Sequence, residues 1–192
     1  SVNFLRAMVF FPHLLSTIAI GVVFSSLMHP TTGIINKGLS LIGINGPDWL
    51  GDIKLSLFSV IMVDFWKGVG VAVIIFIAGI LSIPEEYYEA LLIDGGNYFD
   101  KFKNIILPLS RHSINSVIIL SLIGGLRSFD LIWVMTRGGP GFTTDVISSI
   151  IYKQYQGGFY GVSTTGNVIL FIMVSIIAFP LYKFLSRSEV EL

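Results

Sequence analysis

The sequence has no cysteine, which excludes disulfides, thiolate metal ligands and thiol nucleophiles. Its three histidines, His13, His29 and His112, lie far apart in the chain and do not suggest a metal site. Charged residues make up only 12% of the chain, against roughly 25% in an average soluble domain. The formal net charge is zero and no run of five basic residues occurs. We therefore expect no bound metal and no nucleic-acid partner.

A phosphate-binding loop is also missing. The spacing Gly, four residues, Gly-Lys-Ser/Thr does not occur in the chain. The glycine-rich stretch RGGPGFTT at residues 137–144 lacks the strand-to-helix context of a nucleotide site, and its composition favours a tight turn. The sequence thus predicts no cofactor and no ATP hydrolysis in this chain, which is not expected to be an enzyme.

Apolar residues are abundant: they make up 53% of the chain, and the mean hydropathy is +0.80. Four apolar stretches have about the 20 residues that are needed to cross a membrane. Helices are expected there, because backbone in lipid must satisfy its own hydrogen bonds and no short alternating strands of a barrel are present. The predicted fold is all-α, a polytopic membrane helical bundle with four transmembrane helices at residues 7–28, 57–81, 113–135 and 161–182.

An even number of spans places both chain ends on the same side as residues 83–110, the loop between the second and third spans. That side carries six basic residues: Arg6, Lys101, Lys103, Arg111, Lys183 and Arg187. The other side carries four: Lys37, Lys54, Arg137 and Lys153. Because cytoplasmic loops carry an excess of Lys and Arg, we predict a multi-pass protein of the plasma (inner) membrane whose 83–110 loop is cytoplasmic.

The loop at residues 83–110 has the pattern of two short helices joined by a turn. Ser82, followed by Pro84 and Glu85, resembles a capped helix start. At about 100° per residue, the first helix has an apolar face and a largely acidic face. The apolar face is formed by Tyr87, Tyr88, Leu91, Leu92 and Gly95. Gly95 allows a left-handed turn, and Pro108 precedes the third span. From these residues alone the element is either an ordinary interfacial helix or a surface for a partner.

The spacing within this loop is specific. Glu89-Ala90-Leu91, three residues, Gly95, nine residues, Ile105, one residue and Leu107-Pro108 follow one another. This order resembles the cytoplasmic "EAA" loop of binding-protein-dependent ABC transporter permeases, in which Glu-Ala-Ala replaces Glu-Ala-Leu. The departure at Leu91 concerns local packing. The stretches SIPEEYYEA, FDLIWVMTRGGPGFTT and FFPHLLSTIAIGVVF resemble the sugar-importer branch of these permeases, so the resemblance covers nearly the whole chain.

The resemblance implies a permease that pairs with a second permease subunit and takes a sugar substrate from an extracytoplasmic solute-binding protein. Two ATPase subunits would hold ATP and Mg, and the loop would be a coupling helix that fits into a groove of the ATPase. The loop residues expected to take part are Glu89, Ala90, Leu91, Asp94, Gly95, Ile105, Leu107 and Pro108. Such permeases usually have two further spans before the first one here, so residues 1–192 are expected to be a partial transmembrane domain.

Polar residues within the spans are candidates for a translocation path, because they are costly to place in membrane lipid. Asp64 and Lys67 are three residues apart, as are Arg127 and Asp130, so each set is expected to pair on its helix. These pairs are either structural or part of the path. The candidate path residues are Asp64, Arg127, Ser128, Asp130, Trp133 and Asn167. Five glycines are expected to let helices approach closely: Gly68, Gly70, Gly79, Gly124 and Gly125.

Other functions fit parts of the sequence. An intramembrane aspartyl protease would use close carboxylates such as Asp64 and Asp130. Each of these has a basic neighbour three residues away, however, and the Gly-x-Gly-Asp context of that family is missing. A channel needs a symmetric filter or a charged ring, and neither is evident. A noncatalytic membrane scaffold or a channel-like subunit stays open as the alternative to a permease.

Overall fold

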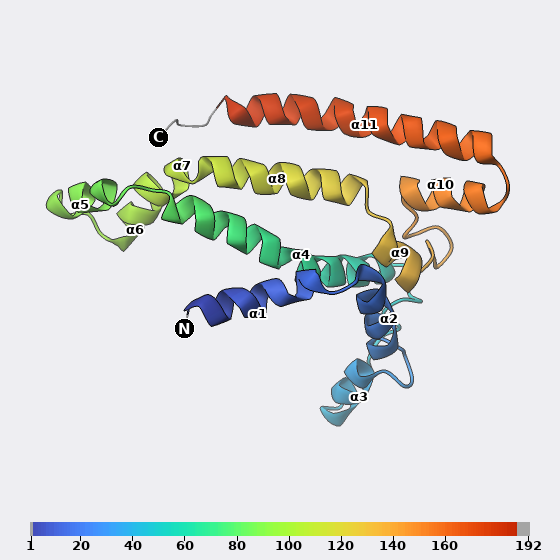
Figure 1. Ribbon diagram of the computed structural model, residues 1–192. Helices are drawn as coiled ribbons and strands as arrows, with labels where there is room; N and C mark the ends of the chain where they lie inside the picture. Colours follow the sequence, from blue (N-terminus) through green and yellow to red (C-terminus); the bar gives the residue numbers. More distant parts are fainter. Residues whose placement is uncertain (1, 188–192) are drawn as a thin grey trace.

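The computed structural model describes residues 2–187, and all regular structure within them is helical (Figure 1). Three long helices run side by side: α4 (Ser56–Leu81), α8 (Arg111–Leu126) and α11 (Tyr160–Ser186). Helix α8 contacts both of the others, and α1 (Val2–Leu14) packs against α4. The predicted all-α fold is confirmed.

Two single helices are long and apolar enough to cross a membrane: α4, with 26 residues, and α11, with 27. They correspond to the predicted spans at residues 57–81 and 161–182. Two bent helix pairs, Phe4–Leu14 with Thr17–Leu27 and Tyr98–Leu109 with Arg111–Leu126, are further candidates if each pair counts as one crossing. The described residues therefore contain two to four candidate crossings.

The stretch at residues 7–28 was expected to be one helix, and it is two. Helix α2 (Thr17–Leu27) leaves α1 at an angle of 91°. Ser16, between them, has a ψ of 129°, which is outside the helical region. Pro12 lies in the last turn of α1 and has no N–H to donate to the preceding turn. The prediction of a continuous helix failed because a high hydropathy says nothing about helix direction.

The stretch at residues 113–135 is also broken, so the prediction of one helix there is wrong. Helix α8 ends at Leu126, and α9 (Asp130–Met135) is a separate short helix. Phe129 separates them with φ −147° and ψ −56°, which are not helical values. Asp130 lies in the first turn of α9, where a carboxylate interacts favourably with the helix dipole.

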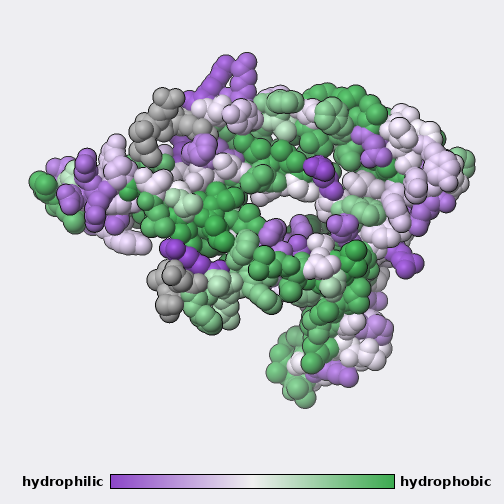
Figure 2. Space-filling view, in the orientation of Figure 1, coloured by the Kyte–Doolittle hydropathy of each residue, from purple (hydrophilic) through white to green (hydrophobic). Residues whose placement is uncertain are grey.

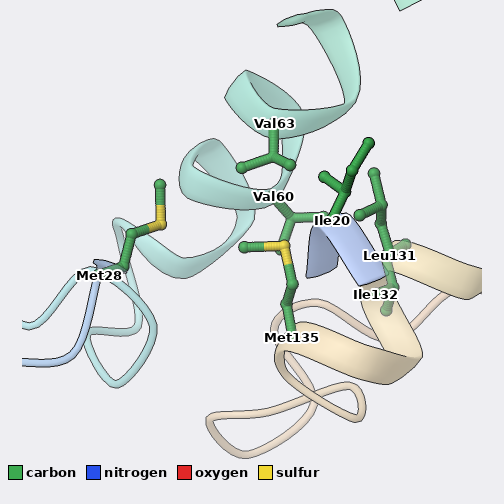
Figure 3. Close-up of a cluster of buried hydrophobic side chains, with 7 residues drawn as sticks. All are labelled: Ile20, Met28, Val60, Val63, Leu131, Ile132 and Met135. Atoms are coloured by element: carbon green, nitrogen blue, oxygen red, sulfur yellow. The ribbon is translucent and has the colours of Figure 1, made fainter. Parts of the chain in front are cut away.

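The main hydrophobic core forms where the broken segments meet (Figure 3). Side chains of α2, α4 and α9, with one that follows α2, make up this cluster: Ile20, Met28, Val60, Val63, Leu131, Ile132 and Met135. Each such buried side chain stabilises the fold by roughly 1.5–3 kcal/mol relative to an exposed one. The two breaks allow α2 and α9 to turn toward the first half of α4, and this packing holds both bends in place.

Two connections carry short helices, α3 (Ile34–Leu41) and α10 (Ile147–Gln156). Helix α10 packs on α11. The first connection is organised by Asn36, whose buried amide nitrogen donates to the carbonyl oxygens of Pro30 and Pro47 at 3.0 and 2.9 Å. Its Oδ1 accepts a hydrogen bond from Trp49 Nε1 at 2.7 Å. These bonds fold residues 30–49 into one unit.

The loop at residues 83–110 contains four short helical elements: α5 (Glu85–Ile93), α6 (Tyr98–Asp100), the π-helix η1 (Lys101–Ile106) and α7 (Leu107–Leu109). Figure 1 shows the loop at the end of the long helices opposite to α9 and α10. The sequence predicts that Ser82 caps α5, and this prediction is wrong. Ser82 ends α4, where its hydroxyl donates to the Gly79 carbonyl at 2.8 Å, and Pro84 stands at the N-cap of α5.

Candidate functional site

A cavity of about 760 Å³ lies between α4 and α8. Charged residues line it from both sides: Asp64 and Lys67 from α4, and Arg127 and Asp130 from the break after α8. The hydroxyl-bearing Ser128 lies between the last two. Figure 2 shows an opening in the middle of the molecule with hydrophilic residues at its edge. The volume of the cavity is within the range of small-molecule sites, about 300–1,000 Å³.

Four of the six predicted path residues line this one cavity: Asp64, Arg127, Ser128 and Asp130. Both chain breaks border it as well. His13 and Thr17 flank the first break and line the cavity, and Phe129 does so at the second. Non-helical backbone at membrane depth is tolerated where it lines a cavity, because there it does not face lipid. The position of both breaks follows this rule.

The predicted ion pairs are not formed. Within residues 2–187, neither Asp64 with Lys67 nor Arg127 with Asp130 makes an ion pair, whereas Asp145 and Lys153 do. Arg127 follows the end of α8, and Asp130 begins α9, so these two do not share one helix. The charges of both sets therefore line the same cavity without direct pairing.

The five glycines fall into two groups. Gly70 lies against the Val9 backbone of α1, and Gly79 lies against Ser113 of α8, so a side chain at either would collide with the neighbouring helix. The other three line the cavity and have nothing within 4 Å of a Cβ position: Gly68, Gly124 and Gly125. The expected role in helix packing is correct for the first two glycines and wrong for these three, which leave space in the cavity.

A second, smaller pocket of about 320 Å³ lies between α10 and α11. Asn167, a predicted path residue on α11, lines this pocket and not the cavity. The lining combines aromatic rings with hydroxyl and amide groups: Phe129, Ser148, Ile151, Tyr152, Tyr155, Ser163 and Asn167. Phe129 lines the cavity too, so its side chain forms part of the wall of both spaces.

Trp133, the sixth predicted path residue, lines neither space. Its ring stacks on Phe129, with centroids 5.8 Å apart and 19° between the planes. It also meets Tyr152 edge-on at 4.7 Å, and Tyr152 lies 5.1 Å from Phe129. Such aromatic contacts are worth about 0.5–1.5 kcal/mol beyond area burial. Trp133 therefore lies behind the lining rings and holds them in position.

Several lining residues were not predicted from the sequence. His13 and Thr17 become notable only once the first span is broken, and the available signal was Pro12 followed by Ser16, a helix stop and a helix start. Tyr152 became part of a site only because α10 packs on α11. Nothing in the sequence specifies that contact between two separate helices.

The loop at residues 83–110 presents a second surface. No residue of α5 is buried, and Leu92 and Ile93 are 73% and 86% exposed. Only Tyr88 and Leu91 of this helix are half-buried, and Lys101 Nζ lies 4.1 Å from the centre of the Tyr88 ring. The predicted apolar face is therefore packed in part, because Leu92 belongs to it and stands in the open.

The turn after α5 is fixed by local geometry. Gly95 has a φ of +74°, in the left-handed region that favours glycine, and has open space around it. The Asn97 side chain accepts hydrogen bonds from the backbone nitrogens of Phe99 and Asp100 at 2.8 and 3.1 Å. The Asp100 carboxylate accepts in return from the Asn97 backbone nitrogen at 3.0 Å, which completes a capping box.

The eight motif residues have different environments. Five are exposed: Glu89, Ala90, Asp94, Gly95 and Leu107. Leu91 and Pro108 are half-buried, and Ile105 is buried, with 6% of its surface exposed. Ile105 thus anchors the second half of the loop, while the first half presents its motif side chains at the surface.

These features define a polytopic helical membrane protein with a cavity between its helices that is lined by apolar and charged residues, and with a folded loop at one end. The chain belongs to the family described as binding-protein-dependent transport system inner membrane component, whose family model matches residues 2–189. This confirms the family resemblance of the loop motif.

Individual relatives are named for sugars. The chain is 35% identical over 170 residues to the trehalose/maltose transport system permease protein of Thermococcus litoralis, covering 88% of this chain and 58% of that protein. It is 31% identical over 189 residues to the multiple sugar-binding transport system permease protein of Streptococcus mutans, covering 98% and 65%. The chain thus spans 58% and 65% of the lengths of these relatives.

A solved structure has the same fold. A chain of a bacterial ABC transporter involved in the import of the acidic polysaccharide alginate matches with a TM-score of 0.88 and 25% identity. The match covers 96% of this chain and 65% of that one. Another structure, of a bacterial alginate ABC transporter with its alginate pentasaccharide-bound periplasmic protein, matches with a TM-score of 0.81 and 26% identity.

Proposed function

We propose that this chain is a transmembrane permease subunit of an ABC importer and forms part of the translocation path for a sugar or oligosaccharide. The observation that carries the proposal is the cavity between α4 and α8, in a chain of this transport family. Relatives named for trehalose, maltose and multiple sugars support the substrate class.

The chemistry of the cavity suits a sugar. Asp64 and Asp130 accept hydrogen bonds from hydroxyls, Lys67 and Arg127 donate to them, and Ser128 does both. Because these donors and acceptors do not neutralise one another in ion pairs, a polyhydroxylated ligand can replace the water around them. The apolar part of the lining, from both α4 and α8, provides contact for the CH groups of a sugar ring.

The loop at residues 83–110 is proposed to be the coupling element, which fits into a groove of a separate cytoplasmic ATPase. Its exposed surface mixes apolar side chains such as Leu92 and Ile93 with carboxylates such as Glu89. Carboxylates are costly in lipid, and exposed large apolar groups favour a protein contact, so an aqueous protein partner satisfies both. The capping box and the Gly95 turn support transmission of force, because a rigid element passes on a displacement.

The complete importer then contains a second permease subunit, two ATPase subunits and an extracytoplasmic solute-binding protein. ATP and Mg belong to the ATPase subunits, so this chain is not itself an enzyme. The permease lies in the plasma (inner) membrane, in contact with lipid, with the loop on the cytoplasmic side. The capture of a pentasaccharide by the periplasmic protein of a structural neighbour supports the same order of delivery.

The docking surface is tested by Leu92→Asp and Glu89→Ala in the complete transporter, purified from membranes and reconstituted in lipid vesicles. Leu92 is exposed, so its replacement leaves the fold of the loop intact and places a charge in the proposed contact. We expect less co-purified ATPase and about tenfold slower sugar uptake, as for the loss of about 1.4 kcal/mol of binding. The control is Phe142→Asp, because Phe142 is also exposed but lies between α9 and α10, which Figure 1 shows at the other end of the long helices. This variant should retain the ATPase. Full ATPase recovery and uptake in both loop variants would contradict the coupling role.

A further inference from the structure

We infer that the pocket between α10 and α11 is a second sugar subsite, which binds a neighbouring ring of the same oligosaccharide whose first ring occupies the cavity. The inference rests on the proposed function and specifies the substrate class as a saccharide of at least two linked rings. It adds α10 and α11 to a path that is otherwise lined mainly by α4, α8 and the two chain breaks.

The pocket has the two components of a saccharide site. The rings of Phe129, Tyr152 and Tyr155 offer apolar faces for the CH groups of a sugar. The remaining polar lining residues bear groups that hydrogen-bond with sugar hydroxyls: Ser148, Ser163 and Asn167. The pocket lining includes no Asp, Glu, Lys or Arg, in contrast to the cavity, so it suits a neutral part of the ligand.

Asn167 retains hydrogen-bonding capacity for a ligand. Its amide nitrogen donates to the Ser163 carbonyl oxygen at 3.2 Å, one turn earlier in α11. Its Oδ1 has no hydrogen-bond partner among residues 2–187, and a side-chain amide can make up to four bonds. The side chain is exposed at the pocket and is oriented by its own helix, so it is available without rearrangement.

The aromatic wall is held in place before any ligand arrives. Tyr152 is packed edge-on against Trp133, and both rings contact Phe129. The Tyr152 hydroxyl also lies 3.4 Å from the side-chain nitrogen of Gln156, one turn further along α10. Rings fixed in this way lose little entropy on binding, which favours stacking with a sugar.

The two spaces adjoin at Phe129, which lines both. The pocket volume of about 320 Å³ is at the small end of ligand sites, whereas the cavity of about 760 Å³ is near the large end. A single ring cannot contact Asn167 and the charged cavity residues together, because these line separate spaces. Two or more linked rings that pass Phe129 can contact both.

The test measures uptake by the complete reconstituted transporter over linear gluco- and arabino-oligosaccharides, each from one to five rings. The variants are Asn167→Ala and Tyr152→Ala, and Tyr152→Phe keeps the ring while losing the hydroxyl. We expect Asn167→Ala and Tyr152→Ala to raise KM about tenfold for the longest sugar that is imported, and to leave KM for the shortest one unchanged. Tyr152→Phe should have a smaller effect, because stacking persists.

Ile150→Ala is the matched control, because Ile150 lies on α10, is exposed and does not line the pocket. It should leave KM unchanged for every sugar. Trp133 gives a second readout in a transporter whose other tryptophans are replaced by phenylalanine. Its fluorescence should respond to the long sugar in wild type and not in Asn167→Ala.

Three outcomes overturn the inference. If the variants raise KM equally for short and long sugars, or for none, the pocket is not a separate subsite, and the proposed importer function stands. If wild type imports only single-ring sugars, no second ring exists to occupy the pocket. If wild type imports no sugar at all, the proposed function fails first, and the subsite fails with it.

Discussion

At the scale of single residues, Asn36 shows how a polar side chain can organise an irregular segment. It is 7% exposed and serves two carbonyl groups and one indole N–H through three hydrogen bonds. Gly46 lies directly against its amide group, so the backbone closes around it. A buried side-chain amide needs hydrogen-bond partners, and here the carbonyls of Pro30 and Pro47 and the indole N–H of Trp49 supply them.

The replacement Asn36→Ala should therefore destabilise the unit formed by residues 30–49. It leaves the Pro30 and Pro47 carbonyls and the Trp49 N–H without their partner, at a cost of about 1–3 kcal/mol. Thermal unfolding in detergent, followed by tryptophan fluorescence, measures the loss. Ser40→Ala removes one exposed hydrogen bond from the same helix and should change stability by less than about 0.5 kcal/mol. Equal stability of the two variants would argue against a central role for Asn36.

At the scale of elements, the glycine-rich stretch at residues 137–144 is held to α10 by the buried carboxylate of Asp145, which follows it. The Asp145 side chain is 7% exposed and accepts from Lys153 Nζ at 2.8 and 2.7 Å. It also accepts from the Ser149 hydroxyl at 2.8 Å. Because Lys153 lies two turns into the helix, this network joins the end of the glycine-rich stretch to the body of α10.

Asp145→Ala should destabilise this element more than an exposed lysine replacement does. Lys153 and Ser149 lose a shared acceptor, which costs about 1–3 kcal/mol, since Lys153 is still partly hydrated. A double-mutant cycle with Lys153→Ala, followed by thermal unfolding, should give a coupling energy of about 1 kcal/mol. The exposed Lys37→Ala is the control. Strictly additive effects at Asp145 and Lys153 would show that their pairing does not stabilise the protein.

The predicted spans that match the structure are those in which one apolar stretch forms one continuous helix. Residues 57–81 and 161–182 match α4 and α11, because each is a single uninterrupted helix. The spans at 7–28 and 113–135 are also rich in apolar residues, but each changes direction at a short non-helical segment. The core packing of α2 and α9 on α4 selects these bends, and such a contact between distant segments has no local signature.

The predictions for the site residues were likewise correct in part. Asp64, Arg127 and Asp130 were predicted as path residues because charged groups within spans are rare, and with Ser128 they line one cavity. Their pairing was predicted wrongly. Arg127 and Asp130 do not share a helix, whereas Asp64 and Lys67 share α4 and still form no ion pair. Trp133 was proposed for its aromatic ring, but stacking on Phe129 places it behind the lining.

At the scale of the whole molecule, the cavity depends on glycines as much as on charged residues. Gly70 and Gly79 bring α1 and α8 against α4, which closes the bundle on either side of the open region. Gly68 on α4 and Gly125 on α8 line the cavity from opposite helices, and neither has a side chain that would fill it. The same residue type thus draws the helices together at two points and keeps a space between them at others.

Filling this space should stop transport without disturbing the fold. A Cβ at Gly125 meets nothing within 4 Å, so Gly125→Phe places its ring in the cavity with no backbone collision. Because the sugar must compete with that ring for space, we expect its binding free energy in the cavity to weaken by about 1–3 kcal/mol. Uptake should then decrease about tenfold or more, while membrane insertion and ATPase recovery are unchanged. Gly38→Phe is the matched control, because Gly38 also has open space around its Cβ but lies on α3, away from the cavity. If Gly125→Phe transports as well as Gly38→Phe, sugar does not pass between α4 and α8, and the cavity is not the path.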